Sequence, residues 1–469
     1  VLKESPVFKT PEKNVKPGRT VCASGLSTIN KSNIIYALCR LKGVTAFCLA
    51  SDEKEAQTLC NDLSCMGLRA YVYPVRDFNF LDFQSRSHEY EHARLKVLLK
   101  LINHECDVAI ACVDAAAQLT VPRNVLEQSV IEFEEGRELS LEKATKALTL
   151  LGYERFDAVE GSGQFSLRGG ILDFFMPDSD YPVRCEFWGD EITDLSYFDI
   201  ETQRRFKKAD KITLSPSTEI VIEDRAALAD KIEHRAKLLR SKNSAKAKEK
   251  LFSEAELIRS GAMIANADKF INQIYDKPES LFDYLDRNTL VFASEFTAIQ
   301  ERGKSMDFIS NETLMQGFED GTLCRGFDRF ALTFNECTEF LQSHGTIVLE
   351  NFVHGSMPIK LSEIISFSTK QLSAWGGSYK QLKEDVDGLF TPESKGVIFA
   401  GTERAAKNLC DTFNADGINA VYSEGADKIS KGELLVMQGA LSAGFEYPSQ
   451  KFFAITYSQV SYGPEKSKK

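Results

Sequence analysis

The chain has 469 residues with a formal net charge of −11, and 43% of its residues are hydrophobic and 27% charged. These values are ordinary for a soluble globular protein of roughly three or four domains. The acidic balance argues against general nucleic-acid binding by the bulk surface, and no apolar run approaches the ~20 residues that span a bilayer.

The eleven cysteines are scattered and form no CxxC pair, so we expect buried, reduced thiols in a cytoplasmic protein and no metal site built on cysteine. The chain starts at Val1 without a Met and ends on the polar residues PEKSKK. From these two ends we expect a piece of a longer protein.

Strand and helix patterns alternate through the first part of the chain. Apolar strand patterns occupy residues 20–25, 44–50, 70–74 and 107–113, with helical patterns at 32–41, 53–66 and 89–102. This alternation predicts a parallel sheet with helices on its faces, and we assign it to a first domain portion at residues 1–130.

The first strand-to-helix turn is the place where such a fold would hold a phosphate. It contains Gly25, Lys31 and Ser32, which resemble parts of a GxxxxGK[ST] loop, but Ile29–Asn30 stand where the second Gly is needed. Because a β-branched residue resists the positive φ of such a loop, we predict a degenerate site that does not hold ATP.

Two short motifs suggest other chemistry. Residues 88–92 read HEYEH, a formal zinc-protease match. In the longer form of that motif, however, Leu95 and Leu98 occupy the positions of the Gly and the third His. The apolar face of this helix favours a packing role, with a zinc hydrolase as the alternative. Residues 302–305 read RGKS, half of a phosphate loop, and Ala298 replaces the Gly it requires.

Residues 131–216 are predicted to form an inserted α+β module with an antiparallel sheet. Gly189–Asp190 separates two strands as a tight hairpin turn would, and a bulge is expected at Gly169–Gly170 within a first strand at 164–175. Alternation along Val183–Trp188 places Val, Cys and Phe on one face and Arg184, Glu186 and Trp188 on the other. An exposed Arg beside an exposed Trp is typical of protein-binding hot spots, although an ordinary solvated face is the alternative.

Residues 217–370 are predicted to complete the first domain. Residues 220–285 look helical, and 231–250 carry eight Lys or Arg against two Glu. We favour a solvated helix, with Leu238, Leu239 and Leu251 toward the core, over a nucleic-acid contact, because no aromatic residues interleave the charges. Strands are expected at 290–294, 330–334, 346–350 and 364–368.

The first of these strands ends in Ala293–Ser294–Glu295, where a helicase would carry an Asp for Mg²⁺. After a linker at 374–379, residues 380–460 are predicted to form a small α/β domain. The fold class is therefore α/β: a degenerate RecA/helicase-like parallel-sheet domain split by an inserted module and followed by a small domain.

Residues 151–205 contain GYER, GQFSLRGGILDFF, PVRCEFWGDEI and TQR, and they resemble the module shared by UvrB and the transcription-repair coupling factor family, Mfd. The resemblance implies docking onto UvrA through Arg168, Arg184 and Trp188, where the family usually has Phe at the last position. It also implies a recruiting part without catalysis or cofactor of its own, with RNA polymerase, duplex DNA and an ATP- and Mg-dependent motor belonging to the full-length factor. The alternative is a UvrB-like damage-verification ATPase or helicase with divergent motifs.

Overall fold

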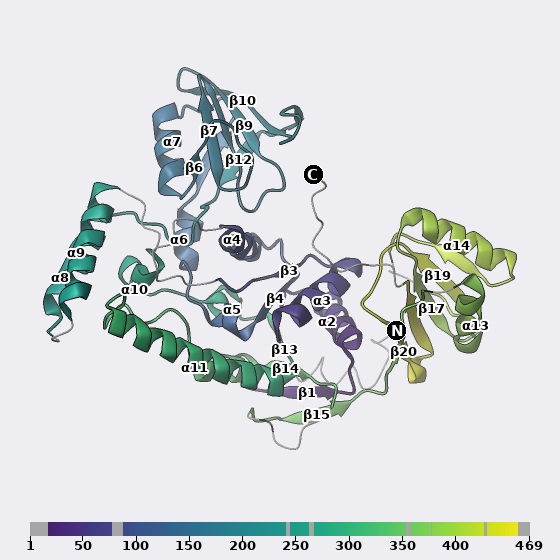
Figure 1. The fold of residues 1–469 in the computed structure, drawn as a ribbon. Coiled ribbons are helices and arrows are strands. Elements are labelled where there is room, and N and C mark those ends of the chain that lie inside the picture. Colours follow the sequence, from purple (N-terminus) through teal and green to yellow (C-terminus); the bar gives the residue numbers. More distant parts are fainter. Residues whose placement is uncertain are drawn as a thin grey trace.

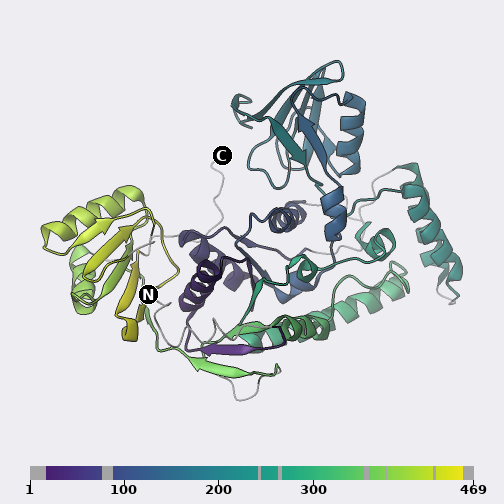
Figure 2. The same cartoon turned by 180° about the vertical axis from the view of Figure 1, so that it is seen from behind.

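A computed structural model describes residues 17–76, 88–240, 244–261, 267–352, 357, 359–376, 378–425 and 429–457. Its strands form a seven-stranded sheet, two six-stranded sheets and a two-stranded sheet. In Figures 1 and 2 the antiparallel module stands above the seven-stranded sheet, and the C-terminal sheet lies to one side of it. The α/β class predicted from the sequence is confirmed, with one parallel sheet and separate antiparallel strands.

The seven-stranded sheet is parallel and is built from two stretches of chain. Its order is β15-β1-β14-β13-β2-β4-β3, with β1 at Val21–Ser24, β2 at Ala46–Ala50, β3 at Ala70–Val72, β4 at Val108–Cys112, β13 at Leu290–Ser294, β14 at Thr346–Leu349 and β15 at Glu363–Ser366. The chain leaves this sheet after β4 and returns at β13. Its central strands are buried on both faces, which explains why they read as continuous apolar runs.

Helices cover both faces of the parallel sheet. Helices α2 (Thr28–Lys42) and α3 (Glu53–Cys65) contribute to one apolar core, and α4 (Glu89–Ile102), α5 (Val113–Ala117), α11 (Phe296–Asp320) and α12 (Phe334–His344) contribute to the other. The short helix α6 (Arg123–Gln128) leads from this domain toward the module.

The prediction of a strand at 330–334 is wrong. Only Ala331 makes an isolated bridge there, and Phe334 begins α12. Thr333 and Glu336 form a capping box, in which each side chain accepts a hydrogen bond from the other's backbone N–H. This cap fixes a helix start inside a sequence whose apolar alternation looks like a strand.

The antiparallel module contains one six-stranded sheet and one strand pair. The sheet runs β11-β10-β9-β8-β7-β6, with β6 at Glu154–Arg155, β7 at Gln164–Arg168, β8 at Ile171–Phe174, β9 at Val183–Trp188, β10 at Glu191–Phe198 and β11 at Arg205–Lys208. Strands β5 (Ile131–Glu134) and β12 (Lys211–Leu214) pair with each other. Helix α7 (Leu141–Leu150) packs Ala144 and Leu148 into the core on one face of the sheet.

A helical segment lies between the module and β13. It contains α8 (Arg225–Leu238), α9 (Ser244–Ser260), the 3₁₀ turn Ala267–Phe270, α10 (Ile271–Ile274) and the 3₁₀ turn Leu281–Tyr284. Leu251 is buried and Leu239 packs partly against the same core, as predicted, whereas Leu238 is exposed and that prediction is wrong. Leu238 is the last residue of α8 and faces solvent, and the next residue, Leu239, makes the core contact instead.

The C-terminal sheet begins at Lys370, ahead of the predicted start at 380. Its order is β16-β20-β21-β17-β19-β18, with β16 at Lys370–Leu372, β17 at Lys395–Phe399, β18 at Ala420–Tyr422, β19 at Glu433–Met437, β20 at Gly444–Tyr447 and β21 at Phe452–Thr456. Helices α13 (Tyr379–Leu389) and α14 (Glu403–Ala415) cover one face, and the 3₁₀ turn Pro448–Gln450 joins β20 to β21.

The other face of this sheet shares an apolar core with α2 and α3 of the parallel-sheet domain. At this contact, Ser442 donates its backbone N–H and its hydroxyl to the buried carboxylate of Asp62, both at 2.7 Å. The two parts of the chain are therefore packed together rather than joined only by a linker.

Candidate functional site

The face of the antiparallel sheet opposite α7 is charged and solvent-facing, and we call it the outer face. Val183, Cys185 and Phe187 point into the core beside α7, so the alternate residues of β9 lie on the outer face. The predicted parity of this strand is confirmed. The outer face also carries acidic and basic residues of the neighbouring strands, namely Arg168, Asp173, Asp194 and Arg205.

Two tight turns lie at the same end of the outer face. Arg168 pairs with Ile171 across Gly169–Gly170, and Trp188 pairs with Glu191 across Gly189–Asp190. The predicted bulge at Gly169–Gly170 is wrong, because this pair is a hairpin turn that divides the expected first strand into β7 and β8. Gly170 lies so close to the next strand that an added Cβ would stand 2.7 Å from the carbonyl oxygen of Phe187.

The buried carboxylate of Asp173 organises the two arginines of the predicted site. Arg184 donates Nε to Oδ1 and Nη2 to Oδ2, each at 2.8 Å, and Arg168 donates Nη2 to Oδ2 at 2.9 Å. Asp173 is 1% exposed, so this bidentate pair is largely shielded from water. The hydrogen bonds to Asp173 raise the pKa of Arg184 and keep it charged.

The two arginines differ in how much of each a partner could reach. The Arg184 side chain is 13% exposed, donates further hydrogen bonds to the carbonyl and side-chain oxygens of Gln203, and stacks on Phe198 at 4.4 Å from the ring centre. The Arg168 side chain is 51% exposed and uses one nitrogen on Asp173. Arg168 therefore offers free donors, whereas Arg184 mainly holds the face in place.

Trp188 is the large apolar residue that stands out on this face, with 82% of it exposed. Farther along the sheet, Arg205 pairs with Glu186 and with Asp194 at 2.9 Å. The outer face thus places an exposed aromatic ring at the end of a fixed network of arginines and carboxylates. Such an arrangement suits contact with a protein, since aromatic and Arg residues are enriched at interface hot spots.

The degenerate phosphate loop is filled by the chain itself. The ammonium of the buried Lys31 lies 2.6 Å from a carboxylate oxygen of Glu295, 3.2 Å from Glu55 and 2.9 Å from the hydroxyl of Ser294. The two segments compared with nucleotide motifs therefore meet in space, and the carboxylates of Glu295 and Glu55 neutralise Lys31. Burial by itself would raise the pKa of Glu55, but Lys31 and hydrogen bonds from Ser294 and Ser51 hold it below its usual value.

Backbone groups of the same loop are also engaged. Gly25 has φ +79° and donates its N–H to the carbonyl of Asn351, while Leu26 donates to the carbonyl of Glu350. A Cβ on Gly25 would stand 2.3 Å from the carbonyl oxygen of Phe367, so the chain after β15 closes over the loop. The amides that would approach a phosphate are thereby used within the fold.

Ser32, the last residue of the degenerate motif, donates its hydroxyl to Asp62 at 3.3 Å. It therefore points toward the contact with the C-terminal sheet. Burial raises the pKa of Asp62 to about 6, against the lowering effect of hydrogen bonds from Ser442 and Ser32.

The HEYEH histidines are used for packing. His88 lies 2.9 Å from the buried carboxylate of Glu91, and the ring of His92 packs so close to Gly163 that an added Cβ there would be 2.6 Å away. Burial lowers the pKa of His92. Within the described residues, no group of three His, Cys, Asp or Glu is arranged to hold a metal ion. The RGKS half-motif lies inside α11, where Gly303 is buried.

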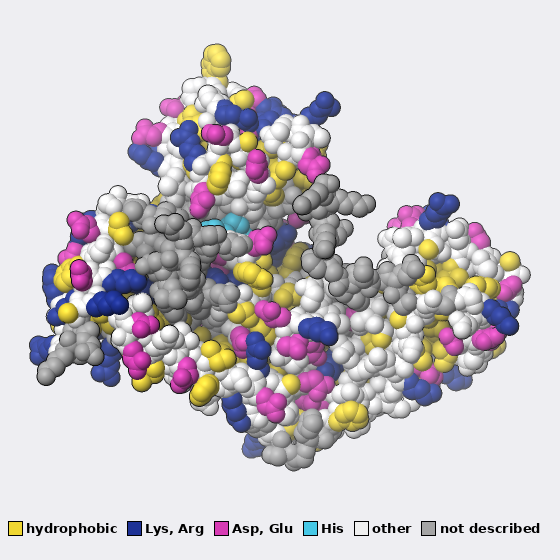
Figure 3. Space-filling model, in the orientation of Figure 1, with side chains coloured by type: hydrophobic (Ala, Val, Ile, Leu, Met, Phe, Trp, Pro, Cys, Tyr) yellow, Lys and Arg dark blue, Asp and Glu magenta, His cyan; other side chains and the backbone are white. Residues whose placement is uncertain are grey.

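Residues 231–238 of the basic segment lie on α8 and residues 244–250 on α9, residues 239–240 follow α8, and residues 241–243 are outside the described part of the chain. Lys237 pairs with Glu233 within α8, and Arg259 of α9 pairs with Asp230 and Glu233. Figure 3 shows Lys and Arg side chains interleaved with Asp and Glu over this region. The pattern fits a solvated helical hairpin.

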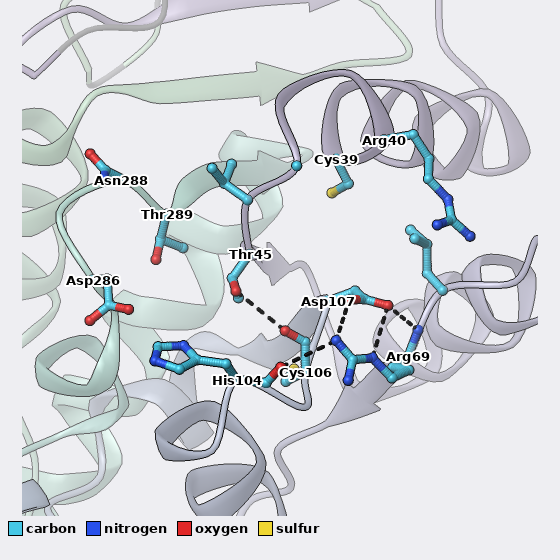
Figure 4. A pocket seen from close by; sticks show the side chains of 13 residues that line it. Cys39, Arg40, Thr45, Arg69, His104, Cys106, Asp107, Asp286, Asn288 and Thr289 are labelled. Carbon is cyan, nitrogen blue, oxygen red and sulfur yellow. Dashed lines mark hydrogen bonds and ion pairs between the residues drawn. The ribbon is translucent and has the colours of Figure 1, made fainter.

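A cavity of about 460 Å³ lies at the amino ends of the parallel strands. Figure 4 shows Arg69 and Asp107 turned toward each other at its wall, and the Arg69 Nη2 lies 2.8 Å from Asp107 Oδ1. Open α/β sheets bind ligands at the carboxyl ends of their strands, the opposite edge. This cavity therefore supports no site assignment.

The fold and the outer face together define an α/β protein with a rigid antiparallel module suited to a protein partner. Residues 131–220 match the family model described as the UvrB interaction domain. The chain is 26% identical over 473 aligned residues to the transcription-repair-coupling factor of Bacillus subtilis, covering 98% of this chain. It is 25% identical over 410 residues to that of Staphylococcus epidermidis and 22% identical over 408 residues to that of Staphylococcus aureus. The predicted resemblance is confirmed: the chain is homologous to transcription-repair-coupling factors.

The matches cover 40% of the Bacillus subtilis protein and 33% of the Staphylococcus epidermidis protein. The chain thus spans about a third to two fifths of the length of these relatives. No helix in the described ranges combines the length and apolar content needed to cross a membrane.

Sequence reasoning missed Asp173, the residue on which both arginines converge. It lies inside the apolar run ILDFF, and a lone carboxylate in such a run was the available signal. Its cross-strand partner Arg184 becomes evident only from the register of β8 against β9, which the sequence does not reveal.

Proposed function

We propose that the outer face binds UvrA and that this chain is the UvrA-recruiting part of a transcription-repair coupling factor. The observation that carries the proposal is Trp188, which is exposed on the same face as the half-exposed Arg168, on a sheet whose arginines are held by Asp173. The match of residues 131–220 to the UvrB interaction domain supports the same location.

In this proposal Trp188 and Arg168 contact UvrA directly. Burying an exposed Trp side chain of roughly 200 Å² against UvrA would contribute about 5 kcal/mol at about 25 cal/mol per Å². The free nitrogens of Arg168 would meet a carboxylate of UvrA, and loss of one partner of such a pair costs roughly 2–5 kcal/mol. Arg184 exposes only a small edge of its guanidinium to UvrA, and it holds the side chain of Asp173, to which Arg168 is also bonded, in position.

In the full-length factor, recruitment would follow recognition of RNA polymerase stalled at a DNA lesion. Contacts with RNA polymerase and duplex DNA, and the ATP and Mg of a translocase motor, would belong to the part of the relatives that this chain does not span. The role proposed for this chain is to recruit UvrA to the lesion, so that nucleotide excision repair can begin there.

We also propose that this chain does not hydrolyse ATP. Lys31 is neutralised by Glu295 and Glu55, and the loop amides of Gly25 and Leu26 are bonded to the chain after β14. A phosphate would have to displace both sets of contacts. The competing assignment, a UvrB-like ATPase with divergent motifs, requires this displacement.

Isothermal titration calorimetry with purified UvrA tests the recruiting role. Trp188→Ala and Arg168→Ala should each weaken the affinity by tens-fold or more, because each removes an anchor of the outer face. Lys146→Ala is the matched control, since Lys146 is an exposed cation on α7, which packs on the other face. Unchanged affinity in both outer-face variants would remove the basis of the proposal.

A further inference from the structure

A second cavity, of about 550 Å³, lies in the C-terminal sheet domain, far along the chain from the outer face. Residues that follow strands form its floor: Ala400, Gly401 and Thr402 come after β17, and Tyr457 comes after β21. Strands β17 and β21 are parallel neighbours, so these residues gather at the carboxyl edge of the sheet. We call this site the C-terminal cavity.

The carboxyl edge of this sheet is the usual place for a ligand. Strands β18 and β19 lie on one side of β17, whereas β20 and β21 lie on the other side. Helix α14 follows β17 at this edge. In open α/β sheets, ligands bind in the crevice outside the carboxyl ends of the strands.

The wall of the C-terminal cavity is aromatic and fixed. The rings of Trp375 and Tyr457 lie 4.8 Å apart, and the two residues form a parallel bridge in which Trp375 donates its backbone N–H to Thr456 at 2.7 Å. Trp375 also donates its indole N–H to the carbonyl of Ser378 at 3.2 Å. The two ring planes are tilted by 52°, so a planar ring that stacks on Trp375 meets Tyr457 with its edge. The entropic cost of stacking is small, because Trp375 is already held.

The side-chain amide of Asn408 gives the cavity a group that can form hydrogen bonds with the edge of a heteroaromatic ring. Asn408 lies on α14 and lines the cavity, and within the described residues its side chain makes no hydrogen bond. An Asn amide both donates and accepts, and it pairs with the donor and acceptor on the edge of adenine.

The charges near the cavity favour an uncharged ligand. Its lining residues include no Lys, Arg, Asp or Glu. The first turn of α14, which could attract a phosphate, carries Glu403, and the carboxylate of Glu403 is paired with Lys407 at 2.6 Å. Arg404 follows Glu403 in the same turn, so the turn carries no net charge and the cavity lining supplies no cation for a phosphate.

We propose that the C-terminal cavity binds a purine base, stacked on Trp375, in edge contact with Tyr457 and paired with Asn408. The base can be a free nucleoside or a base displayed by single-stranded nucleic acid, since both present the same ring. This proposal stands independently of UvrA binding.

Tryptophan fluorescence provides a direct test. The chain has two tryptophans, so Trp188→Phe leaves Trp375 as the single reporter. Adenosine, or an oligodeoxyadenylate if the base comes from a strand, should quench this emission in a saturable way. The response to one probe and not the other identifies the source.

Asn408→Ala should weaken the binding roughly 5- to 100-fold, as expected for loss of a paired ring edge. Asn408 is exposed, so the variant should fold, and Asn419→Ala, at the amino end of β18 in the same sheet, should leave the affinity unchanged. The proposal is overturned if neither probe binds at about 10 mM, or if Asn408→Ala binds as well as its parent. It is also overturned if AMP binds about tenfold or more tightly than adenosine, because a phosphate would then dominate recognition.

Discussion

Replacing Arg184 with Ala separates structural support from direct contact on the outer face. Asp173 is 1% exposed, and Arg184 supplies two of its three hydrogen bonds from arginines. Without Arg184 the carboxylate keeps only Arg168, which is itself half exposed. The variant should therefore loosen β8 and β9 as well as weaken UvrA binding.

The expected loss of stability in Arg184→Ala follows from this geometry. Breaking a fully buried ion pair costs about 3–5 kcal/mol, and the remaining bond to Arg168 reduces the cost here to about 2–3 kcal/mol. Arg168→Ala should cost less than about 1 kcal/mol of stability, because an exposed pair contributes little. Arg168 is therefore the cleaner probe of UvrA contact.

Hydrogen–deuterium exchange of the whole chain measures this difference locally. In Arg184→Ala, the ladder amides of β8 and β9 should exchange roughly 30- to 150-fold faster, and in Arg168→Ala less than about fivefold faster. Equal acceleration in the two variants, or none in Arg184→Ala, would refute the supporting role of Arg184.

Three other predictions follow from the buried groups. A fluorescent ATP analogue should show no saturable binding at about 1 mM, because Lys31 is already neutralised; saturable binding displaced by ATP would favour the UvrB-like ATPase. Burial raises the pKa of Glu350 from 4.5 to about 7, so the folded chain keeps a proton that the unfolded chain loses. Stability should thus fall as pH rises through that window, and Glu350→Gln should flatten the melting-temperature profile from pH 5 to 8; parallel profiles would contradict this. Ser442→Ala should speed exchange in β19 and β20 by roughly 5- to 30-fold through loss of its hydroxyl bond to Asp62, whereas unchanged exchange would show that this bond does not hold the two sheets together.

Patterns with a strict period could be predicted from the sequence. The parity of β9 follows from alternate apolar residues, and the buried parallel strands follow from continuous apolar runs. The Gly189–Asp190 turn follows from the requirement for positive φ, which Gly189 adopts at +64°.

Contacts between distant segments could not be predicted. Asp173 meets Arg184 in the register of β8 against β9, and the Gly169–Gly170 turn folds β7 back on β8 so that Arg168 reaches the same carboxylate. Lys31 and Glu295 lie 264 positions apart in the chain, so their pairing depends on β1 and β13 joining one sheet. The packing of the C-terminal sheet on α3 likewise could not be predicted, because no local sequence pattern indicates it.

The most direct test of the recruiting role is site-specific photocrosslinking to UvrA. With p-benzoylphenylalanine in place of Trp188, illumination of a mixture with UvrA should yield a covalent complex, because the ring would lie within the interface. The same photoreactive residue in place of Lys146, on the far side of the module, should yield none. A crosslink from the Lys146 position without one from the Trp188 position would contradict the account.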